Sequence, residues 1–241
     1  MYEFTSKVRY SEIGPDARMT LRGIVTRMQD AAVFHSDMIG QGPAVWEKHQ
    51  KIWMIISWQI LVHERPLFGT NVTTRTWTYA FRGFNGFRNF VMEDESGKRL
   101  AEANTQWVYF DAREQRPARI PKEQIAEYGI EEELFIPDKA PRRIPIPEDG
   151  AEGVVREEMQ PFEIQISSID TNRHVNNLAY IDMADNCLPL GTKVKELRVE
   201  YMKQARLGDT ITPVTYRTDR YFMVCLNDAQ GSPCAIIQFM I

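Results

Sequence analysis

The eight residues from Asp170 to Asn177 concentrate side chains that perform acid–base and hydrogen-bonding chemistry. A carboxylate, an amide and an imidazole stand at alternate positions, at Asp170, Asn172 and His174. In an extended or turning segment alternate side chains share one side, so we expect these three to converge on one point. Such a set can orient a water molecule and take its proton as it attacks a carbonyl carbon. The spacing therefore predicts a hydrolytic site.

The apolar segment from Leu178 to Ala184 follows this motif and indicates that a helix begins there. Asn176 and Asn177 are good N-cap residues, and the free N–H groups of a helix N-terminus can stabilise a developing oxyanion. Ordinary turns attract the same residue types, because Asn, Asp and His side chains hydrogen-bond to the nearby backbone. A capped turn without chemistry is therefore an alternative that spacing alone leaves open.

The run from Ile169 to Ile181 resembles the signature D-x-N-x-H-V-N-N-x-x-Y-I of plant and bacterial acyl-acyl carrier protein thioesterases. The resemblance implies a double hotdog fold. It also implies hydrolysis of a fatty acyl thioester, carried on the pantetheine arm of a carrier protein, by Asp170, Asn172 and His174. A fourth catalytic residue, a Glu, is expected from a later segment of the form Y-x-x-E-C.

That later segment departs from the family pattern, because it reads Tyr-Met-Lys-Gln-Ala from Tyr201 to Ala205. The expected Glu is Gln204, whose amide cannot act as a base near neutral pH. We therefore expect Asp170 or His174 to serve as base. The amides of Asn172 and Gln204 would then position the water or the thioester, and N–H groups near the two N-cap residues would hold the oxyanion.

The family's alternative nucleophile, a Cys in that same segment, is also absent, since its position is Ala205. Cys187 follows His174 by thirteen residues and is expected inside the helix as an inert core thiol.

The first half of the chain begins with a helix and continues with strands. Apolar residues from Leu21 to His35 recur in steps of three and four, which predicts an amphipathic helix that ends before Gly40. Segments rich in Thr, Trp, Tyr, Ile and Val predict strands at 52–62, 71–81, 87–92 and 99–110. This order favours an α+β fold in which a long helix lies across an antiparallel sheet.

The centre of this first helix carries small or flexible side chains at Met28, Ala31 and Ala32. These residues could leave room for an acyl tail between helix and sheet, and the family resemblance places the chain-length pocket in this region. Ordinary core packing is the alternative.

Landmarks of the first half return in the second half in the same order. The strand candidate at 162–168 corresponds to residues 8–11, the end of an opening strand candidate at 4–11. Gly208 corresponds to Gly69, and the hairpin at Gly231 corresponds to the hairpin at Gly97. This order predicts an internal duplication.

The duplication also predicts which half carries the chemistry. If Asp16 is aligned with Asp170, Arg18 aligns with Asn172 and Thr20 aligns with His174. The catalytic set is therefore expected only in the second half, and the first half is expected to shape a pocket.

Residues 117–161 separate the two halves and contain seven of the thirteen prolines, among many charges. This composition predicts a connector, not a core element, with a short helix from about Lys122 to Tyr128. We expect an N-terminal hotdog domain with the acyl pocket at 1–140, ending in this linker. A C-terminal hotdog domain with the catalytic motif is expected at 141–241.

The composition is that of an ordinary globular protein, with 43% hydrophobic and 26% charged residues and a net charge of -4. Such a charge argues against a nucleic-acid partner. The three cysteines form no CxxC pair, so we expect no metal, no other cofactor and a reducing cytoplasm. No 18-residue apolar run and no signal-peptide pattern occur, so no membrane association is expected.

The resemblance implies an acyl carrier protein as partner. Carrier proteins are acidic, so docking requires a local basic patch. The candidate residues are Arg173, Lys193, Lys195, Arg198, Lys203 and Arg206. A monomer and a homodimer are both compatible with a duplicated hotdog. An acyl-CoA thioesterase of the same fold and a non-catalytic acyl-binding protein stay open as alternatives.

Overall fold

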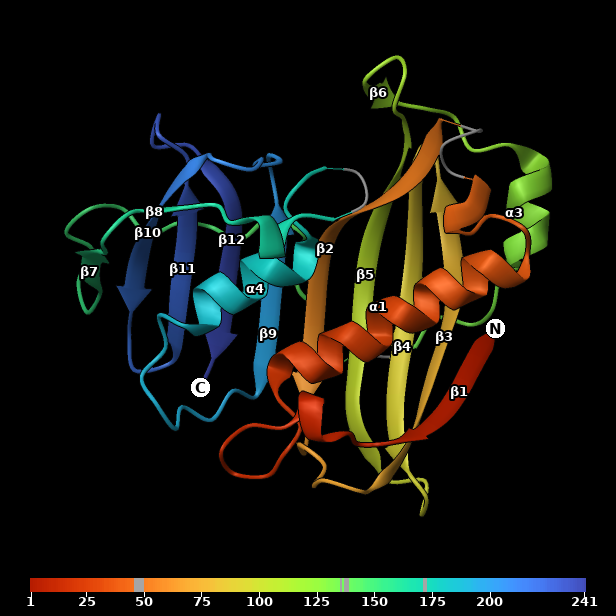
Figure 1. Cartoon of the computed structure of the whole chain (residues 1–241), viewed down its shortest axis with the longest axis horizontal. Helices are drawn as coiled ribbons and strands as arrows, with labels where there is room; N and C mark the ends of the chain where they lie inside the picture. The colour runs from red at the N-terminus through yellow and green to blue at the C-terminus, as the bar shows by residue number, and fades with distance from the viewer. Residues whose placement is uncertain (46–49, 135, 137–138, 171–172) are drawn as a thin grey trace. The chain divides into compact units, whose positions relative to one another are not determined.

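The computed structural model describes residues 1–45, 50–134, 136, 139–170 and 173–241 (Figure 1). These residues form two compact units. The first unit comprises Met1–Ile56 and Ile60–Lys139, and the second comprises Ser57–Gln59 and Ala140–Ile241. Each unit combines an antiparallel sheet with a helix that lies against one of its faces, so the predicted α+β class is confirmed.

The sheet of the first unit has the strand order β1-β3-β4-β5-β2, and β6 pairs with β5. The β-branched and aromatic residues that predict these strands form long antiparallel ladders, and in β3 alternate residues such as Thr74 and Thr76 are fully buried. The strands are β1 (Tyr2–Lys7), β2 (Lys51–Val62), β3 (Asn71–Arg82), β4 (Asn85–Asp94), β5 (Arg99–Asp111) and β6 (Arg116–Pro117).

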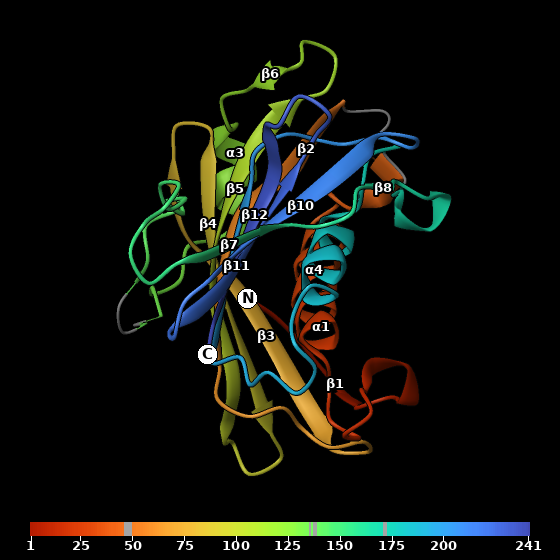
Figure 2. The same ribbon diagram turned by 90° about the vertical axis from the view of Figure 1, so that its left-hand side faces the viewer.

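Helix α1 (Leu21–Met38) crosses the face of this sheet (Figure 1, Figure 2). It begins where the side chain of Thr20 accepts a hydrogen bond from the Gly23 N–H at 3.0 Å, as an N-cap does. Its predicted apolar stripe is buried against the sheet. The short helix α3 (Lys122–Tyr128) occupies the range that the sequence predicts.

The sheet of the second unit has the order β9-β12-β11-β10-β7, and β8 pairs with β10. Helix α4 (Asn177–Asp185) lies against it (Figure 1). At nine residues α4 is half as long as the 18-residue α1, because no apolar stripe continues beyond Asp185 and Pro189 disfavours helix. The strands are β7 (Val155–Glu158), β8 (Phe162–Glu163), β9 (Glu196–Tyr201), β10 (Thr210–Arg217), β11 (Tyr221–Asn227) and β12 (Pro233–Met240).

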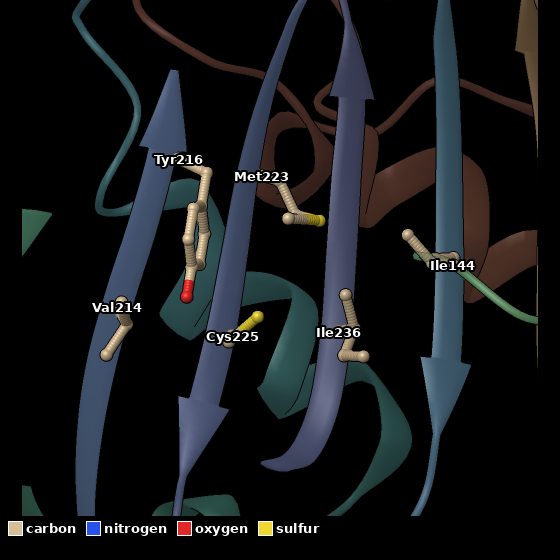
Figure 3. Close-up of a cluster of buried hydrophobic side chains, with 6 residues drawn as sticks. All are labelled: Ile144, Val214, Tyr216, Met223, Cys225 and Ile236. Atoms are coloured by element: carbon tan, nitrogen blue, oxygen red, sulfur yellow. The ribbon is translucent and has the colours of Figure 1, made fainter. Parts of the chain in front are cut away.

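Part of the proline-rich segment is core, which corrects the prediction of a simple connector. Ile144 is only 2% exposed and belongs to a buried cluster in the second unit. Figure 3 shows this cluster in front of the strands, with α4 behind them, so it covers the sheet face that points away from the helix. The other members are Val214, Tyr216, Met223, Cys225 and Ile236. Truncating Ile144 to Ala should therefore cost about 2–5 kcal/mol.

Matching backbone hydrogen bonds confirm the internal duplication. The N–H of Gly69 donates to Val8 O, and the N–H of Gly208 donates to Ile164 O in the same way. Both glycines have φ near +80°, at +82° and +83°, a conformation that glycine adopts without steric cost. The predicted strand at 162–168 is strand only in β8, and its end is the 3₁₀ turn η2 (Ile166–Ser168), which matches η1 (Tyr10–Glu12).

Within the described ranges, the structure contains no helix that is long and apolar enough to cross a membrane.

Candidate active site

The predicted motif lies between η2 and α4, and its described residues are Asp170 and 173–177. An isolated antiparallel bridge joins Ile169 to Val175. The backbone N–H of Asp170 donates to His174 O at 2.8 Å, and the Asp170 carboxylate accepts from the His174 N–H at 3.2 Å. These bonds bring the Asp170 carboxylate to the backbone of His174, and the convergence of the side chains stays a prediction. Asn172, the third member of the predicted set, lies outside the described residues.

The imidazole of His174 is half-buried. Its Nδ1 atom is shielded from water and has no hydrogen-bond partner among the residues that the structure describes. A buried ring nitrogen of this kind is expected to meet a water molecule or a substrate atom when the site is in use. Its surroundings are thus compatible with a role in proton transfer.

The two asparagines after the loop have separate structural roles. Asn176 is the N-cap of α4, and its side chain accepts from the Leu178 N–H at 2.9 Å. The Asn176 N–H donates to Ser168 O at 2.8 Å, so it is not available to an oxyanion. This narrows the predicted oxyanion donors to the first residue of the helix, Asn177, whose N–H is at the positive end of the helix dipole.

The loop that carries Gln204 is held next to the motif by two hydrogen bonds. The N–H of Val175 donates to Ala205 O at 3.0 Å, directly after His174 in the chain. The N–H of Ala205 in turn donates to the hydroxyl of Tyr180 in α4 at 2.8 Å. Gln204 itself is exposed. Two segments that are thirty residues apart in sequence therefore meet at the predicted site.

Tyr180 is a contributor that the chemistry of the motif did not single out. It is 3% exposed, and burial raises the pKa of its hydroxyl to about 12. The hydroxyl therefore stays protonated and acts as a fixed hydrogen-bonding group. Its position three residues after Asn177 was the available sequence signal, but an aromatic in an apolar helix ordinarily indicates core.

Cys187 is not in a nucleophilic environment. It lies two residues beyond the end of α4, not inside the helix as predicted, and its Sγ donates to Met183 O at 3.4 Å. Burial raises the pKa of the thiol to about 11, which keeps it protonated near neutral pH. The expectation of an inert thiol stands.

The first unit contains a loop of the same geometry without the catalytic side chains. A bridge joins Ile13 to Met19, and the Gly14 N–H donates to Arg18 O at 2.9 Å. This bond matches the one from Asp170 to His174 O, so the alignment of Asp16 with Asp170 is wrong by two residues. The counterpart of Asp170 is Gly14, and the counterpart of the imidazole is Arg18.

The counterpart of Gln204 is Arg65, because the Met19 N–H donates to Pro66 O at 2.8 Å as Val175 does to Ala205. Arg65 forms an ion pair with Asp16, which occupies the position of Asn172. The first unit thus fills the equivalent positions with a charged pair and has no imidazole there.

A pocket opens inside the first unit, between α1, α3 and the sheet. Ala32 lines it, as predicted, whereas Met28 and Ala31 are fully buried core residues that do not. Most of its wall is aromatic or apolar, and its polar members were not predicted. The pocket is lined by Ala32, Val33, Ser36, Gln41, Trp53, Thr78, Phe81, Gly86, Phe87, Arg88, Trp107 and Tyr128.

A metal site is not evident in the part of the chain that the structure describes, since no group of three or more His, Cys, Asp and Glu side chains there could hold an ion.

Comparison with protein families gives two matches. Residues 1–128 match the model of the acyl-ACP thioesterase N-terminal domain, and residues 152–232 match that of the acyl-ACP thioesterase C-terminal domain.

Several curated relatives come from plants. A palmitoyl-acyl carrier protein thioesterase of Arabidopsis thaliana is 26% identical over 224 residues, covering 86% of this chain and 53% of the relative. A dodecanoyl-[acyl-carrier-protein] hydrolase of Cinnamomum camphora is 23% identical over 229 residues, covering 89% of this chain and 59% of the relative. The chain spans about half the length of the curated relatives it matches.

Solved structures share the fold across the whole chain. An acyl-ACP thioesterase of Bacteroides thetaiotaomicron superposes with a TM-score of 0.87 at 18% identity, covering 99% of this chain and 96% of that chain. A 12:0-ACP thioesterase of Umbellularia californica superposes with a TM-score of 0.84 at 20% identity, covering 99% of this chain and 96% of that chain. This likeness confirms the predicted fold, two tandem hotdog domains.

Proposed function

Because the chain belongs to the acyl-ACP thioesterase family, we propose that it hydrolyses the thioester between a fatty acyl chain and acyl carrier protein. The products are the free fatty acid and the carrier thiol, so the reaction ends chain elongation. The observation that carries the proposal is the convergence of the Asp170–His174 loop with the Gln204 loop through the bond from Val175 N–H to Ala205 O.

The reaction requires a water molecule that attacks the thioester carbonyl carbon. Asp170 or His174 takes a proton from this water, the carbon–sulfur bond breaks, and the carrier thiolate leaves and is protonated. A thiolate is a good leaving group, so positioning and one general base suffice, with the base contributing roughly 10²- to 10⁴-fold.

Three further groups support this reaction in the proposal. The amides of Asn172 and Gln204 position the water or the thioester by hydrogen bonding, since neither can accept a proton near neutral pH. The N–H of Asn177 at the start of α4 stabilises the oxyanion that forms on the carbonyl oxygen.

The two halves of the chain have different tasks in this proposal. Residues 1–140 bind the acyl chain in the pocket at Ala32, where Met28 and Ala31 support the pocket from the core. Residues 141–241 carry the catalytic motif. The counterpart loop of the first unit supports this division, because it offers Gly14 and Arg18 in place of the carboxylate and the imidazole.

The carrier protein needs basic side chains that are free to meet it. Of the six predicted, Lys203 pairs with Asp228 at 2.5 Å, and Arg198 is half-buried and donates to Pro141 O at 2.7 Å. Lys195 Nζ donates to Ile241 O at 3.3 Å. The exposed Arg173, Lys193 and Arg206 are therefore the docking residues that we retain. The cytoplasmic location and the choice between monomer and homodimer stay predictions.

The test is thiol release from matched acyl carrier protein thioesters and acyl-CoA thioesters with chains from C4 to C18. We expect faster release from the carrier protein, with Asp170→Asn lowering the rate while the protein stays folded. Faster release from CoA would make the protein an acyl-CoA thioesterase. Tight acyl binding without any release would make it a non-catalytic acyl-binding protein, and either result would contradict the proposal.

A further inference from the structure

The acyl pocket of the first unit contains a charged side chain at its wall. Arg88 in β4 lines the pocket, although the residue is only 5% exposed. Its Nη1 atom donates to His35 Nδ1 at 3.0 Å and to Thr76 Oγ1 at 3.1 Å. Its guanidinium also lies over the ring of Tyr128, 5.6 Å from the ring centroid. A pocket for a plain hydrocarbon tail has no need of this group.

The charge of Arg88 has no carboxylate partner among the residues that the structure describes. Its hydrogen-bond partners there are a histidine ring and a hydroxyl, both neutral. The pKa of His35 is lowered to about 3 by burial and by the Arg88 charge, so the imidazole accepts a hydrogen bond without adding charge. Burial also lowers the pKa of Arg88, but only to about 10, so the guanidinium stays charged near neutral pH.

An uncompensated buried charge is costly, and the cost falls when an anion binds to it. The guanidinium carries five donors in a planar fork, which matches a carboxylate in a bidentate arrangement. Both hydrogen bonds of Arg88 to described residues leave from Nη1, so its remaining donors are available for such a contact.

Two neighbouring hydroxyls lie on the same wall. The hydroxyls of Ser36 and Tyr128 lie 2.8 Å apart and both line the pocket. Because the Ser36 hydroxyl donates to Ala32 O at 3.0 Å, the Tyr128 hydroxyl donates to Ser36 Oγ, and both protons are used within the wall. The guanidinium of Arg88 therefore supplies the donors for an anion at this wall, while Trp53, Phe81 and Trp107 provide an apolar wall.

We propose that this pocket selects acyl chains whose far end carries a carboxylate, which Arg88 binds. The substrate class is then the half-thioester of a dicarboxylic acid on the carrier protein. The methylene groups pack against the aromatic wall, and the distal carboxylate binds the guanidinium. This inference rests on the proposed thioester hydrolysis and specifies the acyl group.

The experiment compares carrier-protein thioesters of monocarboxylic and ω-carboxylic acyl chains of equal carbon number. The variants are Arg88→Met, which replaces the buried charge by an apolar chain of similar length, and Arg88→Lys, which keeps a charge without the fork. The matched control is Arg82→Met, since Arg82 also stacks on an aromatic ring, Phe87, but is exposed.

We expect the wild type to favour the ω-carboxyacyl chain by about tenfold or more in kcat/KM, a preference worth one charge-assisted pair. Arg88→Met should abolish or reverse this preference, Arg88→Lys should weaken it, and Arg82→Met should keep it. A wild type that prefers the plain chain at every length, with the ratio unchanged in Arg88→Met, would overturn the inference and leave the thioesterase proposal intact.

A binding measurement separates the two proposals if no thioester is hydrolysed. The probes are the monomethyl ester of a dicarboxylic acid and the methyl ester of the monocarboxylic acid of equal length, titrated by calorimetry. Selective binding of the acid-bearing probe, lost in Arg88→Met, would support the pocket assignment although hydrolysis fails. Equal or absent binding of both probes would overturn it.

Discussion

The hydroxyl of Tyr180 accepts a hydrogen bond from the backbone N–H of Ala205 at 2.8 Å. This bond ties the helix that follows the Asp170–His174 loop to the loop that carries Gln204. A second bond, from Val175 N–H to Ala205 O at 3.0 Å, ties the same residue to the end of the motif. Ala205 thus fixes the distance between the two segments on which the proposed chemistry depends.

Replacing Tyr180 with Phe tests this arrangement. The change leaves the buried Ala205 N–H without its acceptor, so we expect a loss of about 1–3 kcal/mol in the free energy of unfolding. We also expect a lower kcat, because the Gln204 loop is no longer fixed. Urea denaturation and thiol release measure the two effects. Tyr10→Phe is the control, since Tyr10 is 82% exposed. A Tyr180→Phe protein as stable and as active as the control would contradict the assignment.

The buried His35 predicts a pH dependence of stability. Its pKa is lowered from 6.5 to about 3, mainly by burial and then by the charge of Arg88. Because the folded-state pKa lies below the unfolded one, the contribution of neutral His35 is complete above pH 6.5 and is lost as the pH falls toward 3. Relative to His35→Gln, we expect the wild type to lose about 1.4 kcal/mol per pH unit in that window.

Urea denaturation at pH 7.5, 6.0 and 5.0 measures this difference. If the free energy of unfolding changes with pH equally in the wild type and in His35→Gln, His35 is protonated in the folded state.

The pocket assignment predicts a change in chain-length preference. Ala32 lines the pocket, so Ala32→Phe should fill part of it and shift the preferred acyl chain to a shorter length. Met28→Leu is the control, because Met28 is fully buried but does not line the pocket, and the swap conserves volume. Thiol release across the chain-length panel measures the profile. A profile that Ala32→Phe leaves unchanged would move the acyl pocket elsewhere.

The amide of Gln204 is predicted to act by hydrogen bonding, not as a base. Gln204→Ala should therefore lower kcat by about tenfold or more, the effect of a lost positioning contact. Gln204→Glu should stay active and acquire a new dependence on pH near the ordinary pKa of Glu, about 4.3. The pH profile of kcat distinguishes these cases. Full activity in Gln204→Ala would remove this residue from the mechanism.

Local patterns predicted the elements of the fold well. The steps of three and four from Leu21 to His35 identify α1, and the density of Thr, Trp and Tyr identifies β3. Where patterns failed, long-range packing had decided the outcome. Ile144 lies among prolines and charges that indicate a linker, yet the outer face of the second sheet buries it.

The candidate site likewise has features that local sequence predicted and features that it did not predict. The motif from Asp170 to Asn177 is contiguous, so its loop and its N-cap could be predicted from spacing. The register of the duplication could not be predicted, because Asp16 resembles Asp170 in residue type. The matching hydrogen bonds of the two loops instead make Gly14 the counterpart of Asp170. Arg88 was missed because a charged residue in a strand ordinarily faces water, whereas this side chain is buried and contacts His35 of α1 and Tyr128 of α3.

The most direct test of the account measures kcat/KM for thiol release from acyl carrier protein thioesters in the wild type, His174→Ala and Arg18→Ala. The two substitutions truncate counterpart positions of the two loops. We expect His174→Ala to lose about 100-fold or more and Arg18→Ala to stay within about twofold, because only the second loop holds the base or its partner. Equal effects of the two substitutions, or full activity in a folded His174→Ala protein, would contradict the account.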